Sequence, residues 1–163
     1  MRYTFLASLS ILIFSCNSNQ TNSNSVAENR DSLRLQLINV DKSWSEHSLQ
    51  KGYHKSRIDF ADNAATDLLE GEMPLHGINE IKEYAASHPD STFTLIWKPL
   101  RCEVATSGEL GYTFGGWTMK TKSKTGKDTL LFGDYMTVWK RQPNGSWKYI
   151  VDGGNNTPKQ VDQ

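Results

Sequence analysis

The residues best able to do chemistry are tyrosines and tryptophans spaced along the second half of the chain. A tyrosine hydroxyl that faces a pocket can donate a hydrogen bond to an oxyanion or to a ligand carbonyl, and tryptophans supply apolar walls. We expect Tyr112 and Tyr135 to touch such a pocket. The alternative is that most of these rings pack the core or a dimer face. The full set is Trp97, Tyr112, Trp117, Tyr135 and Trp139.

These aromatics must be positioned by β-strands, because from Thr92 onward apolar and polar residues alternate with a period of two. Pro99 interrupts the first strand and predicts an edge or a bulge there. Turn signals at 107–108, 125–126 and 144–145 separate strands at 92–104, 110–119, 129–140 and 147–151. Four strands linked by hairpins predict an antiparallel meander. Glycines in the second strand predict a sharp bend or a bulge: Gly111, Gly115 and Gly116.

Helices precede the strands. Leu33, Leu37, Val40 and Trp44 form one apolar stripe of a helix that begins near Asp31 and ends by 51–52, with the charged residues mostly off the stripe. A shorter helix is expected over 53–58 and a short strand over 66–69. A third helix starts after Gly77 and stops before Pro89. Helices first and strands afterwards indicate an α+β fold.

The first sixteen residues resemble a bacterial lipoprotein signal. Arg2 is followed by a short apolar run that is too short to span a bilayer, and the run ends at Ile13-Phe14-Ser15-Cys16. We expect Cys16 to be lipidated; the alternative is an ordinary secretory signal. The expected organisation is a signal peptide (1–15), the lipidated cysteine with a disordered polar tether (16–30), one domain (31–158) and a tail (159–163).

The composition limits which classes of partner, metal and cofactor are expected. The formal net charge is zero, so no overall field favours nucleic acid. Cys102 would be alone in the mature chain, so we expect no disulfide within it. The four histidines contain no HxH or HExxH pair, and no phosphate-binding loop is present. We therefore predict no metal and no cofactor.

Several local patterns together resemble the nuclear transport factor 2-like superfamily, in particular its SnoaL-like and ketosteroid-isomerase-like branch. The matching pieces are Phe60-Ala61-Asp62-x-Ala64, His76-Gly77-x-x-x-Ile81, Ser107-Gly108-x-Leu110-Gly111-Tyr112-Thr113-x-Gly115, Gly133-x-Tyr135-x-x-Val138-Trp139-Lys140, Gly145-x-Trp147-Lys148 and Asp152. The resemblance covers roughly residues 31–158. It implies a cone, in which N-terminal helices pack in a strongly curved antiparallel sheet that leaves a pocket at its open end.

The resemblance also suggests which carboxylate does chemistry. Asp62 lies about where isomerase-like members place a general base, and burial in an apolar pocket would raise its pKa toward neutrality. The alternative is a turn aspartate that is satisfied locally. We expect Asp62, Tyr112 and Tyr135 as catalytic candidates, and Trp97, Trp117, Trp139, His76 and Asp152 as pocket residues.

The leading hypothesis is an envelope-anchored, SnoaL-like domain that binds a small, largely apolar ligand in its cone and forms a homodimer through the outer face of its sheet. The first alternative is a general acid/base isomerase, dehydratase or hydrolase that uses a pocket Asp and Tyr. The second is a non-catalytic structural or interaction lipoprotein whose cone is filled by its own side chains. The only membrane contact expected is the lipid anchor, in the bacterial cell envelope.

Overall fold

The structure is a computed structural model that describes residues 20–162; the signal segment and Cys16 lie outside this range. Within residues 20–162, three α-helices and six strands follow one another in the order α1, α2, β1, β2, α3, β3, β4, β5, β6. The helices are α1 (Gln20–Lys51), α2 (Tyr53–Phe60) and α3 (Gly77–Ser87), and a 3₁₀ turn covers Asp90–Thr92. The strands are β1 (Ala61–Leu68), β2 (Leu75–His76), β3 (Phe93–Val104), β4 (Leu110–Lys122), β5 (Asp128–Arg141) and β6 (Trp147–Thr157).

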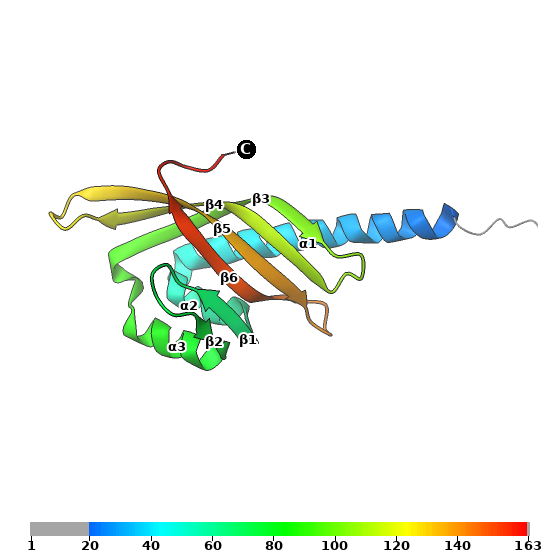
Figure 1. The fold of residues 1–163 in the computed structure, drawn as a ribbon, viewed down its shortest axis with the longest axis horizontal. Helices are drawn as coiled ribbons and strands as arrows, with labels where there is room; N and C mark the ends of the chain where they lie inside the picture. The colour runs from blue at the N-terminus through cyan, green and yellow to red at the C-terminus, as the bar shows by residue number, and fades with distance from the viewer. Residues whose placement is uncertain (1–19, 163) are drawn as a thin grey trace, which may run out of the picture.

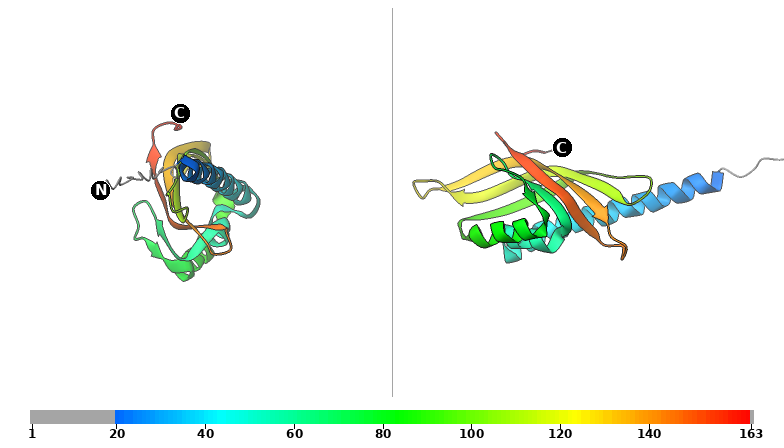
Figure 2. Two further views of the ribbon diagram at one scale, coloured as in Figure 1. Left: turned by 90° about the vertical axis from the view of Figure 1, so that its right-hand side faces the viewer. Right: turned by 60° about the horizontal axis from the view of Figure 1, so that its bottom comes forward.

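All six strands form one curved sheet in the order β2-β1-β6-β5-β4-β3, and Figure 1 shows α1 running along it. The predicted antiparallel meander is confirmed as β3-β4-β5-β6. The sheet is mixed, however, because β1 pairs with β6 in parallel. The α+β cone expected from the sequence is therefore present. The end-on view shows the sheet curled about its helices rather than flat (Figure 2, left).

Helix α1 begins earlier than the sequence predicts. It starts at Gln20 rather than near Asp31, so residues 20–30, expected in a disordered tether, are helical, and this end projects beyond the sheet (Figure 1). The apolar stripe is present, with Leu37 and Trp44 buried. Asp41 was expected off the stripe, but it is 0% exposed and lies among these residues.

Two serines on the buried face of α1 form hydrogen bonds with backbone groups of an edge strand. β3 ends the sheet and has no strand on its outer side. Ser45 Oγ accepts the N–H of Trp97 at 2.9 Å, and Ser48 Oγ donates to the carbonyl of Leu95 at 3.1 Å. Unpaired edge groups would otherwise be costly to bury. One helix thus closes the open side of the cone.

The irregularity in the pairing of β3 with β4 lies in β3, not in β4. The β3–β4 register shifts between Pro99 and Arg101, as a proline in a strand favours. β4 pairs with β5 without a break from Leu110 to Lys122, so the bulge expected at its glycines is absent. A Cβ on Gly115 would lie 2.1 Å from the carbonyl oxygen of Lys98, so this glycine permits a close approach instead.

The core lies between α1 and the inner face of the sheet. Trp44 is its centre: it stacks on Tyr149 with ring centroids 4.9 Å apart and meets Trp139 edge to face at 5.7 Å. Its Nε1 donates to Ser56 Oγ at 3.1 Å, which ties α1 to α2. Among the described helices, none combines the length and the apolar character needed to cross a membrane.

Candidate functional site

A cavity of about 230 Å³ opens beside this core, between α1, α2 and the inner face of the sheet. Its walls combine five aromatic side chains with aliphatic and neutral polar residues and four charged side chains. Binding sites for small molecules commonly combine apolar walls with a few placed polar groups. The aromatic wall consists of Trp44, Tyr53, Trp97, Trp117 and Tyr135.

Trp97 forms the corner of this wall. Its ring is close to perpendicular to those of Trp44 (82°), Tyr53 (82°) and Tyr135 (70°), at centroid separations of 5.0, 6.1 and 6.4 Å. Edge-to-face contacts of this kind are the favoured geometry for aromatic pairs. The rings therefore hold one another in place and keep the cavity open.

Trp117 lies flat across Gly133 of the neighbouring strand. A Cβ at Gly133 would approach the Trp117 ring to 2.0 Å, so the glycine makes room for the indole. The indole is also anchored, because its Nε1 donates to the carbonyl of Asp134 at 3.0 Å. The sequence pair of glycine and tryptophan thus sets one side of the cavity.

Asp41 lies behind the aromatic wall and holds two of its members. Its carboxylate accepts the indole N–H of Trp97 at 2.7 Å and the hydroxyl of Tyr135 at 2.8 Å. Burial raises the pKa of Asp41 to about 6, against the lowering effect of these hydrogen bonds. The same contact occupies the Tyr135 hydroxyl, so this hydroxyl is not a free donor to a ligand.

Arg57 and Asp67 form a buried ion pair at the cavity wall. Arg57 Nη2 donates to Asp67 Oδ2, and both side chains are only 2% exposed. Tyr149 also donates its hydroxyl to Asp67 Oδ2, at 3.4 Å. Two atoms of the pair, Arg57 Nε and Asp67 Oδ1, are buried without a hydrogen-bond partner. Such atoms are rare in folded proteins and mark a place where a bound molecule can contribute the missing contact.

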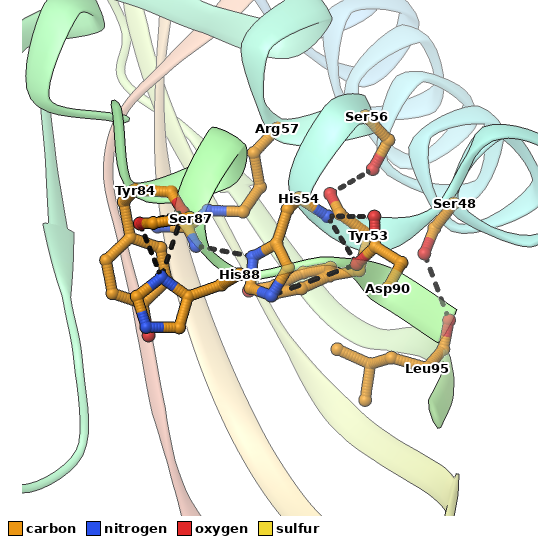
Figure 3. Close-up of polar contacts among 10 residues, drawn as sticks. All are labelled: Ser48, Tyr53, His54, Ser56, Arg57, Tyr84, Ser87, His88, Asp90 and Leu95. Carbon is orange, nitrogen blue, oxygen red and sulfur yellow. Dashed lines mark hydrogen bonds and ion pairs between the residues drawn. The ribbon is translucent and has the colours of Figure 1, made fainter. Parts of the chain in front are cut away.

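Helices α2 and α3 hold Arg57 in position (Figure 3). Tyr53 lies one helical turn before Arg57, on the same face of α2, and its ring centroid is 5.3 Å from the guanidinium carbon. Tyr84 of α3 contributes a second ring at 5.8 Å. The start of α2 is fixed by Asp90, whose carboxylate accepts the N–H of His54 at 3.0 Å. The arginine is thus held between two rings.

Asp152 is a cavity carboxylate that is held by neutral hydrogen-bond donors, the Thr137 hydroxyl and the backbone of Gly153. Thr137 Oγ1 donates to its Oδ1 at 2.6 Å. Burial raises the pKa of Asp152, while the Thr137 hydrogen bond and the Arg57 charge oppose the rise. In the described part of the chain, no lysine, arginine or histidine forms an ion pair with it.

The structure places four of the predicted residues at the cavity: Trp97, Trp117, Tyr135 and Asp152. Asp62 is elsewhere. Its Oδ1 accepts the N–H of Ala64 at 3.0 Å and its Oδ2 accepts from Gln142 at 2.9 Å. These hydrogen bonds lower its pKa. The prediction of a buried base is therefore wrong for Asp62, whose carboxylate is hydrogen-bonded near the start of β1 and does not line the cavity.

Three other predicted residues also lie outside the cavity. Tyr112 pairs with Glu103 and Val138, next to the inward-facing Thr113, so strand alternation turns it to the outer face. Trp139 faces inward but is fully buried, and its Nε1 donates to Thr113 Oγ1 at 2.9 Å. His76 is exposed at the sheet edge, where its N–H donates to Glu80 at 2.6 Å.

The sequence reasoning missed the three charged residues that organise the site: Asp41, Arg57 and Asp67. Asp41 had a detectable signal, because it lies four residues after Leu37 and three before Trp44 on the apolar stripe. Arg57 and Asp67 have no comparable signal, since α2 and β1 are short and largely polar. Among residues 29–162, no group of three or more histidine, cysteine or acidic side chains is arranged to hold a metal.

The fold has many known counterparts among solved structures. A ketosteroid isomerase-like protein from Erwinia carotovora matches with a TM-score of 0.62 at 14% identity, over 75% of this chain and 95% of its own. A nuclear transport factor 2-like protein from Novosphingobium aromaticivorans matches with a TM-score of 0.66 at 10% identity, over 86% and 92%. A calcium/calmodulin-dependent protein kinase II association domain from Xanthomonas campestris matches with a TM-score of 0.53 at 15% identity, over 98% and 99%.

No protein-family profile matches the sequence, and no curated protein sequence matches it. The structural likeness therefore concerns the fold. The chain has the nuclear transport factor 2-like cone, and its aromatic-walled cavity lies between the helices and the inner face of the sheet. The resemblance drawn from the sequence motifs is confirmed at that level.

Proposed function

We propose that this protein binds a small ligand in the aromatic-walled cavity of its cone, on the inner side of the sheet. The observation that carries the proposal is a cavity of about 230 Å³ whose walls include five aromatic rings, a buried ion pair with two unpartnered atoms, and a carboxylate without an ion-pair partner. A cone packed solid by Trp97, Trp117 and Trp139, as the structural alternative required, would leave no such space.

Screening a fragment set by ligand-observed NMR tests the proposal. Leu68 is 50% exposed and lines the cavity, so Leu68→Trp should fill the entrance without disturbing the core. Leu130 is 51% exposed but lies on the far hairpin, so Leu130→Trp is the matched control. Fragments should bind the wild type and the control and lose binding in Leu68→Trp. Binding that survives Leu68→Trp would contradict the proposal.

Acid–base catalysis in the same cavity is the second candidate, and Asp152 favours it. A cavity carboxylate whose pKa is raised by burial is a stronger base than an ordinary aspartate, which suits it to take a proton from a substrate. Asp152 would take the role first expected of Asp62, with Thr137 orienting it. Catalysis predicts that a bound fragment with an acidic C–H exchanges deuterium, and that Asp152→Asn abolishes this exchange while binding remains.

We also propose that the domain is anchored to the cell envelope through Cys16 and that it forms a homodimer. The anchor rests on the sequence of residues 1–16. A Cys16→Ala variant should move from the membrane fraction to the soluble fraction, and unchanged fractionation would refute the anchor.

The homodimer is supported by the partly apolar outer face of the sheet and by structural counterparts described as association domains.

A further inference from the structure

The charged side chains around the cavity are mostly acidic. One cation, Arg57, lines it together with three carboxylates, Asp67, Glu70 and Asp152. Arg57 and Asp67 neutralise one another as a buried ion pair. Asp152 forms no ion pair among the described residues, although the charge of Arg57 acts on it, and Glu70 adds a further negative charge. The cavity is therefore set up to receive positive charge rather than negative charge.

The walls suit a cation as well. An ammonium or guanidinium group is attracted to the face of an aromatic ring, most strongly to tryptophan. Trp97 and Trp117 line the cavity, whereas the ring of Trp44 is stacked between Phe60 and Tyr149. The chain already uses this attraction in the same wall, because the Arg57 guanidinium lies 5.3 Å from the ring centroid of Tyr53.

The unpartnered atoms indicate the hydrogen bonds that a ligand would make. Asp67 is almost completely buried, and its Oδ1 is an acceptor that receives no hydrogen bond. A protonated amine supplies N–H donors for such an acceptor. Arg57 Nε is a buried donor without an acceptor, which leaves room for a hydroxyl or carbonyl oxygen in the same molecule.

Resting on the proposed ligand-binding function, we infer that the ligand is a small organic cation. Its protonated nitrogen lies against the carboxylates of Asp152 and Asp67, and its apolar part lies among the tryptophans. The inference narrows the expected ligand class, since the sequence alone predicts only a largely apolar molecule. The cavity size restricts the ligand to a compact amine or ammonium compound.

Isothermal titration calorimetry on the full-length protein tests the inference with three probes of similar shape. Benzylammonium is the cation, benzyl alcohol the neutral analogue and benzoate the anion. At neutral pH and moderate ionic strength, benzylammonium should bind at least about tenfold more tightly than benzyl alcohol, and benzoate more weakly than either. This comparison needs no variant and so does not depend on the folding of one.

Two carboxylate variants locate the effect. Asp152→Asn should reduce the preference for benzylammonium over benzyl alcohol to nearly onefold, because it removes the charge and keeps the shape. Asp128→Asn is the matched control: this aspartate is exposed at a hairpin end and pairs with Lys122, far from the cavity. It should leave the preference unchanged.

Two results would overturn the inference while the binding function stands. One is benzyl alcohol or benzoate binding as tightly as benzylammonium. The other is a cation preference that Asp152→Asn leaves intact. If instead the fragment screen finds no ligand that Leu68→Trp excludes, the binding function itself fails, and the cation inference fails with it. The two failures are therefore distinguishable.

Discussion

At the scale of single residues, the site depends on carboxylates held in different surroundings. Asp41 is buried behind the wall, Asp67 is ion-paired and Asp152 faces the cavity, whereas Asp62 lies outside the site and is hydrogen-bonded near the start of β1. Burial favours the neutral form of a carboxyl group, and hydrogen bonds to the carboxylate favour the charged form. These opposing effects raise the pKa of Asp41 and lower that of Asp62.

The raised pKa of Asp41 predicts how stability changes with pH. A carboxyl group with a pKa of about 6 in the folded state and 3.8 in the unfolded state stabilises the fold fully below pH 3.8, and this contribution is lost as the pH rises through 6. The loss corresponds to about 3 kcal/mol. Asp41→Asn lacks a titrating group, so its stability relative to wild type should rise by about that amount from pH 4 to pH 7.

Urea unfolding of wild type and variant across this pH range measures the difference. Asp62→Asn is the control of opposite sign. Its lowered pKa contributes stability above pH 3.8 that is lost as the pH falls, so this variant should gain relative to wild type on acidification. Parallel pH profiles for wild type and Asp41→Asn would contradict the burial of an ionisable Asp41.

At the scale of elements, α1 acts as the closing wall of the cone. Its apolar residues fill the core. Its buried serines form hydrogen bonds with the backbone groups of β3 that have no neighbouring strand. A sheet edge is usually protected by a short strand, a charge or a covering element. Here the covering element is a helix, and the hydrogen bonds of its serines fix which residues of β3 lie opposite it. The cavity wall at Trp97 therefore depends on a contact from α1.

Removing one serine should test this seal. Ser45→Ala leaves the N–H of Trp97 buried without an acceptor, so the free energy of unfolding should fall by about 1–3 kcal/mol. Ser43→Ala, on the exposed face of the same helix, is the control and should have little effect, apart from the slightly better helix propensity of alanine. Equal stabilities of the two variants in urea unfolding would show that the contact contributes nothing.

At the scale of the whole molecule, the sheet separates two functional faces. The inner face carries the cavity, and the alternation that turns Trp97 and Tyr135 inward turns Ile96 and Met136 outward. Ile96 and Met136 are exposed, at 41% and 50%. The C-terminal residues 160–162 also lie against the sheet, beside Lys98 and Gly116. The outer face is thus partly apolar and partly covered by the C-terminal residues.

The proposed homodimer predicts a response to charge on this face. Met136→Asp should weaken dimerisation by more than about tenfold, because it places a charge in an apolar contact. Met73→Asp changes a more exposed methionine on the loop before β2 and should leave the dimer intact. Sedimentation velocity over a range of concentrations distinguishes the two. A wild-type protein that stays monomeric at high concentration would remove the dimer from the proposal.

Much of the fold was predictable because local patterns specify it. The alternation from Thr92 onward and the glycine-containing turns define the meander, and the stripe from Leu33 to Trp44 defines the buried face of α1. The end of α3 before Pro89 follows from the backbone of proline alone. The parallel pairing of β1 with β6 could not be predicted in this way, since no local period records which distant strand a short polar segment joins.

The sequence by itself determined that an aromatic-rich sheet follows amphipathic helices, and it identified Trp97, Trp117, Tyr135 and Asp152 as pocket candidates. Only the tertiary structure decided which carboxylates are buried. Asp62 and Asp67 lie five residues apart on β1. Asp67 points into the cone and pairs with Arg57, whereas Asp62 lies near the protein surface and accepts a hydrogen bond from Gln142. Burial and pairing depend on residues distant in the chain, and these contacts set the charge and the pKa values of a site.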